Sequence, residues 1–134
     1  MKAVLVDSSV VLDLFTGDPA FCDRSVAELA RWGATHELAI NDIVYAEVSV
    51  GFGRIEDLDA ALSGAGFLRV PIPAPALFLA AKAFAAYRRR GGGKQAILPD
   101  FFIGAHAAVS EMPLLTRDVS RVRSAYPTVS IFAP

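Results

Sequence analysis

Short apolar runs alternate along this chain with longer segments whose apolar residues recur at helical spacing. The short runs are rich in aliphatic residues and predict strands at AVLV (3–6), LAI (38–40), FLRV (67–70), PLLT (113–116) and VSIF (129–132). Between the third and fourth runs, Leu77, Ala81 and Phe84 follow the spacing of a helix. Strands that alternate with helices are typical of a parallel sheet.

The composition of the strands indicates how the sheet is covered. AVLV, LAI and PLLT are mostly apolar rather than alternating, as strands are when both faces of a sheet are buried. We expect an α/β fold, a three-layer α/β/α sandwich with a central, mainly parallel sheet of four to five strands and right-handed crossovers. The chain has 134 residues, 54% of them apolar, and its Pro-rich VPIPAP (70–75) is too short to separate domains, so one domain is expected over 1–134.

Polar residues, glycine and proline predict where the helices begin and end. Ser and Asp side chains cap helix N-termini, basic residues followed by glycine suit a C-terminus, and proline suits a first turn. The expected helices are Ser8 or Ser9 to about Phe15, Asp23 or Ser25 to about Trp32, Asp42 through IVYAEVSVGFG, roughly 75 to 90, and LPDFFIGAHAAVSE around Pro99.

Cysteine and histidine are scarce. Cys22 is the single cysteine, so an internal disulfide is excluded, and with two histidines a zinc site of the usual ligands is not expected. The N-terminal AVLV is too short for a signal peptide, and charges recur too often for a membrane span of about 20 residues. We expect a cytoplasmic protein without a membrane segment.

The net charge of −1 at pH 7, taken alone, argues against a nucleic-acid partner. The average conceals an uneven use of charge, because four acids committed to a metal would leave the rest of the chain with a basic excess. Most of the 13 basic residues are arginine, whose guanidinium suits bidentate contact with phosphate. A nucleic-acid partner therefore remains compatible with the charge.

Four acids are predicted to meet at one edge of the sheet. Asp7 directly follows the first strand, and Asp118 comes two residues after PLLT. Ligand sites in open α/β sheets lie beyond these carboxyl ends of the strands. Glu47 and Asp100 are expected in the first turns of the helices after the second strand and around Pro99, near the positive ends of the helix dipoles.

Carboxylates that converge in this way repel one another, and some of their pKa values rise unless cations intervene. Ligation by oxygen alone suits Mg²⁺ or Mn²⁺, and two such ions about 4 Å apart can clamp a phosphoryl displacement. The pattern predicts hydrolysis of a phosphodiester bond by a metal-activated water.

Three segments resemble the PIN-domain ribonucleases, in particular the VapC-type toxins of bacterial toxin–antitoxin pairs. They are VLVDSSVVLDLF at the N-terminus, DIVYAEVSVGFGR in the first half and LPDFFIGAHAAVSEMPLLTRD near the end, in the family's order and spacing. The resemblance covers nearly the whole chain, and the last segment is the most specific. It implies an acidic quartet of Asp7, Glu47, Asp100 and Asp118, with Thr116 as the hydroxyl neighbour.

The same resemblance implies an activity and partners. It implies an endoribonuclease that depends on one or two Mg²⁺ or Mn²⁺ ions, forms a homodimer and is blocked by a cognate antitoxin. The carboxylates would hold the metal, and the RNA products would carry 5′ phosphates.

Each acid also has a simpler structural explanation. Asp7 or Asp118 would cap the helix that follows it, Glu47 would be a solvated helix residue, and Asp100 would complement a helix dipole. Solvated positions on helices or turns are the first expectation for the other acids considered, which are Asp13, Asp18, Glu56, Asp57 and Asp59.

Arginines near the acids are candidates for contact with an RNA backbone. Arg117 and Arg121 lie on either side of Asp118 in the sequence and would attract phosphate without reading sequence, with ion pairing as the alternative. The run RRRGGGK, from Arg88 to Lys94, is either a phosphate cradle or an ordinary helix end. It lacks the Gly-Lys-Ser/Thr of an NTPase loop, which is therefore excluded.

Functions of other classes remain as alternatives. A receiver-like module binds Mg²⁺ to accept phosphate. It requires paired acids after the first strand, whereas this chain has Ser8 and Ser9 after Asp7. A haloacid-dehalogenase-type phosphatase requires a second acid two residues after the first, and this chain has Ser9 at that position. A catalytically silent RNA- or protein-binding module on the same scaffold stays open, as does an acid–base ribonuclease that uses His36 and His106.

Overall fold

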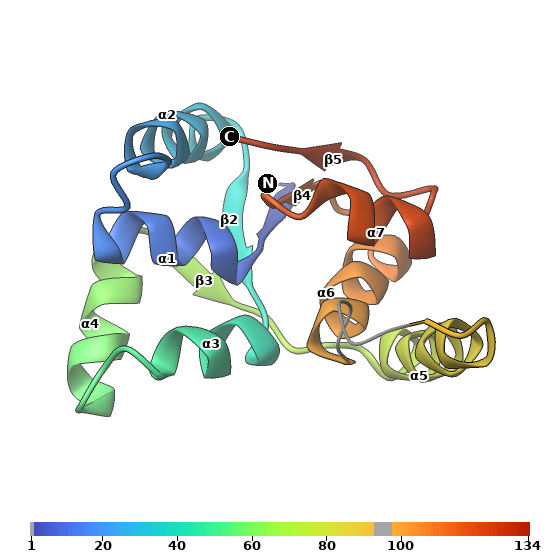
Figure 1. The fold of residues 1–134 in the computed structure, drawn as a ribbon. Coiled ribbons are helices and arrows are strands. Elements are labelled where there is room, and N and C mark those ends of the chain that lie inside the picture. Colours follow the sequence, from blue (N-terminus) through green and yellow to red (C-terminus); the bar gives the residue numbers. More distant parts are fainter. Residues whose placement is uncertain (1, 93–97) are drawn as a thin grey trace.

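The computed structural model describes residues 2–92 and 98–134, and its elements alternate as the sequence predicts (Figure 1). The strands are β1 (Ala3–Val6), β2 (Glu37–Ile40), β3 (Phe67–Arg69), β4 (Leu114–Leu115) and β5 (Ile131–Phe132). The helices are α1 (Ser8–Thr16), α2 (Cys22–Gly33), α3 (Asp42–Ser49), α4 (Ile55–Gly64), α5 (Ala74–Arg89), α6 (Leu98–Val109) and α7 (Val119–Ala125). Each apolar run that was expected to form a strand does so.

The described strands form one parallel sheet in the order β3-β2-β1-β4-β5. The chain first builds outward from β1 through β2 to β3, and then returns to place β4 on the other side of β1. Leu5 of β1 lies opposite Leu114 of β4. In such sheets the strand order reverses at a switch point, here between β1 and β4, and ligands bind in the crevice beyond the strand ends there.

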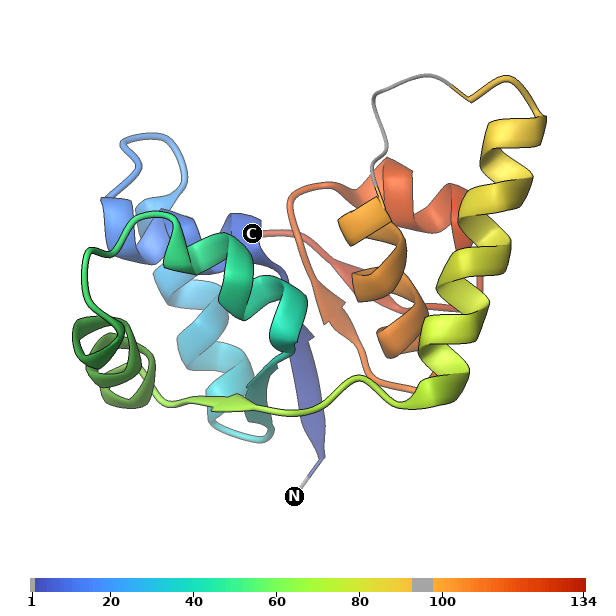
Figure 2. The same cartoon turned by 90° about the horizontal axis from the view of Figure 1, so that it is seen from below.

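Helices cover the sheet on both faces, which confirms the three-layer α/β/α sandwich. Side chains of a strand point alternately to the two faces, and Val4, Leu5 and Val6 are all fully buried. Figure 2 shows α1 to α4 together on one side of β1 and α5 to α7 on the other. Across 2–92 and 98–134, the helices are too short or too polar to cross a membrane.

The helix α6, which carries Asp100, packs closely against the chain that follows α7. A Cβ added to Gly104 would lie 2.4 Å from the ring of Tyr126, so only glycine leaves room for this contact. Tyr126 is buried and its hydroxyl donates to the carbonyl oxygen of Phe101 at 2.9 Å. Two contacts with Tyr126 therefore hold α6 against the chain that follows α7.

The caps of α1 and α3 lie earlier in the chain than expected, and the expected cap residues Ser8 and Asp42 are instead the first residues of the helices. The side chain of Asp7, rather than that of Ser8 or Ser9, accepts the first backbone N–H of α1. The cap of α3 is Asn41, which has the extended backbone of a cap residue, whereas Asp42 is already helical. A cap must lie outside the helix with its side chain turned back toward the first turn, and only these residues meet that condition.

The expected caps of α2 were also wrong. The helix begins at Cys22, after Phe21, whose side chain makes no capping bond, and Asp23 lies within the first turn. Ser25 is fully buried inside the helix and donates to Asp13 instead. A tertiary partner, rather than the helix end, determines the position of this serine.

Candidate active site at the carboxyl edge of the sheet

Three hydrogen bonds fix the carboxylate of Asp7 at the end of β1. Oδ1 accepts the backbone N–H of Ser8 at 2.8 Å, and Oδ2 accepts the hydroxyls of Ser9 at 2.8 Å and Thr116 at 2.7 Å. The residue is 8% exposed. Asp7 therefore caps α1 and at the same time presents an oriented, negatively charged group at the edge of the sheet.

Thr116 links the ends of β1 and β4. Its hydroxyl donates to Asp7 and accepts the backbone N–H of Asp118 at 3.0 Å. Asp118 stands at the cap position of α7, yet its side chain makes no capping bond. The simpler explanation of Asp118 as a helix cap is thus not supported, and its carboxylate remains on the same edge as Asp7.

Glu47 joins this edge from α3. Its Oε1 accepts the hydroxyl of Ser8 at 3.0 Å. Burial raises the pKa of the Glu47 carboxyl above its ordinary value, and the charges of Asp7, Asp100 and Asp118 raise it further. The hydrogen bond from Ser8 acts in the opposite direction and lowers this pKa in part. The pKa of Glu47 therefore reflects the negative charge of all three other acids.

The expected dipole contribution at Glu47 was wrong. Helix α3 runs from Asp42 to Ser49, and Glu47 lies in its second half. The positive end of a helix dipole acts within the first turn. Asp100, in contrast, does lie in the first turn of α6.

Asp100 faces the other acids across a small hollow. Its Oδ2 lies 3.5 Å from Nη1 of Arg121 in α7, and both side chains are partly exposed. The polar residues that line the hollow are Asp7, Asp100, Thr116, Asp118 and Arg121. The structure thus brings Asp7, Asp100 and Asp118 to one place, with Glu47 beside them.

The donor set at this edge fits a hard divalent cation in its chemistry. The four acids supply oxygen ligands alone, and burial first, with the charges of the other acids in addition, makes the ionised form of Glu47 costly until a cation is bound. As the side chains stand, no three Asp, Glu, His or Cys residues of the described ranges are close enough to share one ion. Binding of a cation would therefore have to draw the carboxylates together.

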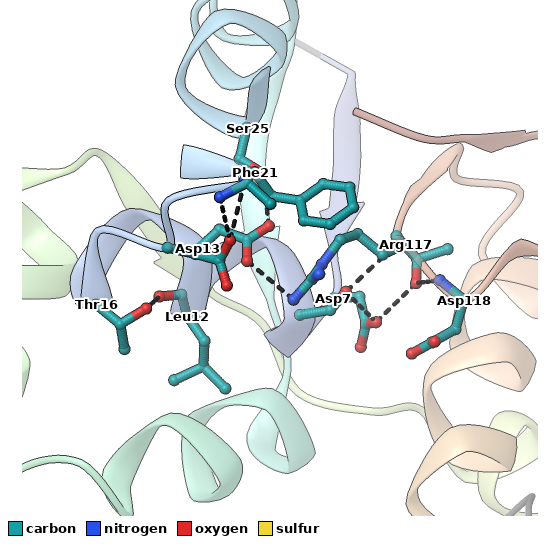
Figure 3. A network of polar contacts seen from close by, with 12 residues as sticks. Asp7, Leu12, Asp13, Thr16, Phe21, Ser25, Arg117 and Asp118 are labelled. Carbon is teal, nitrogen blue, oxygen red and sulfur yellow. Dashed lines mark hydrogen bonds and ion pairs between the residues drawn. The ribbon is translucent and has the colours of Figure 1, made fainter. Parts of the chain in front are cut away.

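Arg117 points away from this hollow toward α1 (Figure 3). Its Nη2 lies 2.9 Å from Oδ1 of Asp13, and its guanidinium lies 4.2 Å from the ring centre of Phe21. Asp13 was expected to be a solvated helix residue, and this was wrong, because its side chain is 1% exposed. For both Arg117 and Arg121 the ion pairing that was the alternative to RNA contact is present.

The structure does not bring Arg88 or the histidines to the four acids. The guanidinium of Arg88 lies 5.8 Å from the ring of Phe84 at the end of α5; Gly93 and Lys94 of its run lie outside the described residues. His36 shares a hydrogen bond with Thr35, whereas His106 is buried and contacts Asn41. Separate partners for the two histidines argue against a two-histidine ribonuclease.

A hollow of about 880 Å³ lies at the opposite edge of the sheet. It is lined by Lys2, His36 and Glu111, among others, and by the residues that precede β4 and β5. None of the four acids lines it. Its size therefore does not make it the candidate active site, because the grouped acids and the switch point lie elsewhere.

Comparison with known proteins identifies the family. A family model described as PIN domain matches residues 4–123, which is most of the chain. The chain belongs to the PIN-domain family. No curated protein matches the sequence. The resemblance seen in the sequence is thus confirmed at the level of the family.

Solved structures share the fold of this PIN domain at low sequence identity. VapBC2 from Rickettsia felis, bound to a DNA fragment from its promoter, aligns with a TM-score of 0.75 at 16% identity over 98% of both chains. VapBC-1 from nontypeable Haemophilus influenzae aligns at 0.73 and 16% identity over 98% of this chain and 97% of that one. A toxin–antitoxin complex from Klebsiella pneumoniae aligns at 0.66 and 23% identity over 95% of both chains. The likeness establishes a shared fold.

Sequence reasoning missed three residues around the acids of this PIN domain. Ser8 and Ser9 donate their hydroxyls to Glu47 and Asp7, and Asp13 holds Arg117. Two hydroxyl residues directly after a strand-end acid were a usable signal for the serines. For Asp13 the signal was a single acid inside the apolar VVLDLF, where a solvated side chain is out of place.

Proposed function

We propose that this PIN domain is a Mg²⁺- or Mn²⁺-dependent endoribonuclease that acts as the toxin of a type II toxin–antitoxin pair. The observation that carries the proposal is the meeting of Asp7, Asp100 and Asp118 around one hollow at the switch point of the sheet, with Glu47 coupled to all of them. The acids come from different segments of the chain. Stability alone does not favour collecting like charges in one place.

The proposed ligands of the divalent cation are the four acids. Asp7 and Asp100 would hold it most directly, with Glu47 and Asp118 completing the shell. A bound Mg²⁺ or Mn²⁺ would lower the pKa of an attacking water and stabilise the charge that develops on the leaving oxygen. The hydrolysis would leave a 5′ phosphate on one product and a free 3′ hydroxyl on the other.

The remaining residues of the site orient these carboxylates and attract the substrate. The donors from Ser8, Ser9 and Thr116 keep Asp7 in one orientation, so the other carboxylates would move toward a fixed group when a cation binds. Arg121 lies 3.5 Å from Asp100 and is 44% exposed, which leaves it able to meet an RNA phosphate. Arg88 would contact the RNA farther from the scissile bond.

The partners in this proposal are an RNA, an antitoxin and a second copy of the chain. The neighbour from Klebsiella pneumoniae is itself a toxin–antitoxin complex, and this supports an antitoxin partner here. We propose a cytoplasmic homodimer, whose mass by light scattering would be twice that of the chain. Addition of the antitoxin would block cleavage by covering the acids.

The experiment that tests the proposal is cleavage of a pool of structured RNAs by the purified chain, with Mg²⁺ or Mn²⁺ against EDTA. The variants are Asp7→Asn and Asp100→Asn, and the matched control is Asp57→Asn, an exposed acid of α4. We expect metal-dependent cutting that leaves 5′ phosphates, is lost by at least a hundredfold in the two site variants and is unchanged in the control.

Other outcomes would contradict the proposal. Cutting that survives EDTA would indicate a metal-independent ribonuclease. Cleavage that persists in Asp7→Asn would exclude the site. Absence of cleavage from the whole RNA pool, with every metal, would favour the silent binding module on the same scaffold.

A further inference from the structure

Asp13 is a buried acid that the proposed mechanism does not use. It lies on α1 with its side chain 1% exposed. Its Oδ2 accepts the hydroxyl of Ser25 from α2 at 2.8 Å, and its Oδ1 pairs with Nη2 of Arg117 at 2.9 Å. A buried carboxylate is costly unless it is paired and hydrogen-bonded. Each oxygen of Asp13 has such a partner, so its orientation is fixed.

Arg117 is held both by its guanidinium and by its backbone. The guanidinium lies between Asp13 and the ring of Phe21, 4.2 Å from the ring centre. The backbone N–H of Arg117 donates to the hydroxyl of Ser9 at 3.2 Å. Since that hydroxyl donates in turn to Asp7 at 2.8 Å, one serine connects the backbone of Arg117 to the candidate site.

The turn between β4 and α7 carries two groups of the candidate site on either side of Arg117. Thr116 precedes it and donates to Asp7, and Asp118 follows it and donates its N–H to Thr116. Figure 3 shows the side chain of Arg117 reaching from this turn to Asp13, with Asp7 and Asp118 next to it. No helix or strand includes residues 116–118. The backbone N–H of Thr116 still donates to the carbonyl oxygen of Phe132 at 3.0 Å, and the contacts of Arg117 and Asp118 hold the rest of the turn.

We propose that Asp13 is a positioning residue: its buried carboxylate holds Arg117 and thereby fixes the turn that brings Thr116 and Asp118 to Asp7. The structural part of this proposal is independent of the reaction. Its effect on turnover rests on the nuclease activity proposed above. Arg117 in this account acts through the turn and is not primarily an RNA contact.

The experiment has to distinguish a network around Asp13 that only stabilises the fold from one that positions the turn at Thr116 and Asp118. A buried ion pair can often be replaced by apolar residues of similar volume without loss of stability, whereas removal of one partner leaves an unpaired buried charge. The triple variant Asp13→Leu, Ser25→Ala, Arg117→Met replaces the whole network with apolar groups, and Met can pack on the ring of Phe21 as the arginine does. Asp13→Asn is the second variant, because it preserves shape and removes charge.

The matched control removes another arginine–carboxylate pair, the partly exposed Glu28 and the exposed Arg31 of α2, which are 2.8 Å apart. Its variant is Glu28→Gln with Arg31→Met. These residues belong to neither the candidate site nor the network around Asp13. All variants are compared with the wild-type chain at a temperature well below their thermal midpoints.

The measurements are the thermal midpoint, the hydrogen exchange of the Arg117 and Asp118 amides, and kcat and KM for an RNA that the wild type cleaves. For the triple variant we expect a midpoint close to that of the wild type, amide exchange at least tenfold faster, and kcat at least tenfold lower with KM within twofold. Asp13→Asn should show the same changes in exchange and kcat. The control should match the wild type in every measurement.

Two results would overturn the positioning role. Unchanged exchange and kcat in the triple variant and in Asp13→Asn would mean that the network supports stability alone. If the triple variant has a higher KM that depends less on salt concentration, with unchanged kcat, Arg117 is instead a direct contact to an RNA phosphate. A wild-type chain that cleaves no RNA would contradict the proposed function, whereas the amide exchange would still decide whether Asp13 fixes the turn.

Discussion

The hydroxyl of Thr116 donates to Oδ2 of Asp7 at 2.7 Å, although 109 positions separate the two residues in the chain. The bond joins the ends of β1 and β4, where the strand order reverses. Thr116 also receives the N–H of Asp118. A single buried hydroxyl therefore sets the relative positions of two proposed ligands.

Replacement of this hydroxyl tests its importance directly. Thr116→Val preserves the shape of the side chain but leaves the N–H of Asp118 without its acceptor. We predict a loss of about 1–3 kcal/mol in the free energy of unfolding, measured by denaturant titration, and at least a tenfold fall in kcat. The matched control, Thr128→Val at an exposed position of the turn after α7, should change neither. Wild-type kcat in Thr116→Val would show that the bond does not orient Asp7 for the reaction.

The raised pKa of Glu47 predicts a stability gain when its charge is removed. A carboxyl with a raised pKa in the folded state contributes stability that is complete below its ordinary pKa of 4.5 and is lost as the pH rises through the folded value. Glu47→Gln retains an acceptor for Ser8 and should stabilise the metal-free protein by about 0.5–2 kcal/mol at pH 7. The gain should shrink below pH 4.5 and when saturating Mn²⁺ is present. A destabilised variant at pH 7 would contradict the repulsion between the acids.

Buried His106 predicts a pH dependence of the opposite sign. Burial lowers the pKa of His106 below its ordinary 6.5, and nearby Asp42 opposes the shift only in part. The unfolded chain therefore binds this proton more readily, so stability is complete above pH 6.5 and is lost as the pH falls from 6.5 through the folded pKa. His106→Gln should lose less stability than the wild type between pH 7.5 and pH 5, as measured by guanidinium unfolding. Equal losses in the two proteins would mean that His106 is not the group responsible.

The packing at Gly104 predicts a steric effect on α6. An alanine Cβ would lie 2.4 Å from the ring of Tyr126, whose hydroxyl is fixed by its bond to Phe101. Gly104→Ala should therefore destabilise the fold by about 1–3 kcal/mol, the usual effect of overpacking. Gly64→Ala, where nothing lies within 4 Å, is the matched control and should be neutral or slightly stabilising. A neutral Gly104→Ala would show that Tyr126 moves aside without cost.

The sheet could be predicted from the sequence because each buried strand is a short, uninterrupted run of apolar residues. AVLV and LAI are apolar without interruption, and the structure buries them on both faces. The relation of Asp7 and Asp118 to strand ends was likewise a local signal. Parallel strands place these ends on one edge, so the sequence alone predicts where the site lies.

The features that sequence reasoning missed depend on distant partners or on backbone angles. Asp13 is buried because Ser25 and Arg117 satisfy it, and Arg117 lies far along the chain. Asn41 rather than Asp42 caps α3 because only Asn41 has an extended backbone. Neither property is encoded in spacing. Spacing likewise does not show that Glu47 lies in the second half of α3, because this depends on the residue at which α3 begins.

The measurement that tests the central claim most directly is isothermal titration calorimetry of Mn²⁺ binding to the chain without RNA. The proteins are the wild type, Asp7→Asn, Asp100→Asn and the control Asp57→Asn. If the acids form one cation site, the wild type and the control will bind with the same Kd, and each site variant will bind at least tenfold more weakly. Equal binding by all of these proteins, or none by the wild type, would contradict the account.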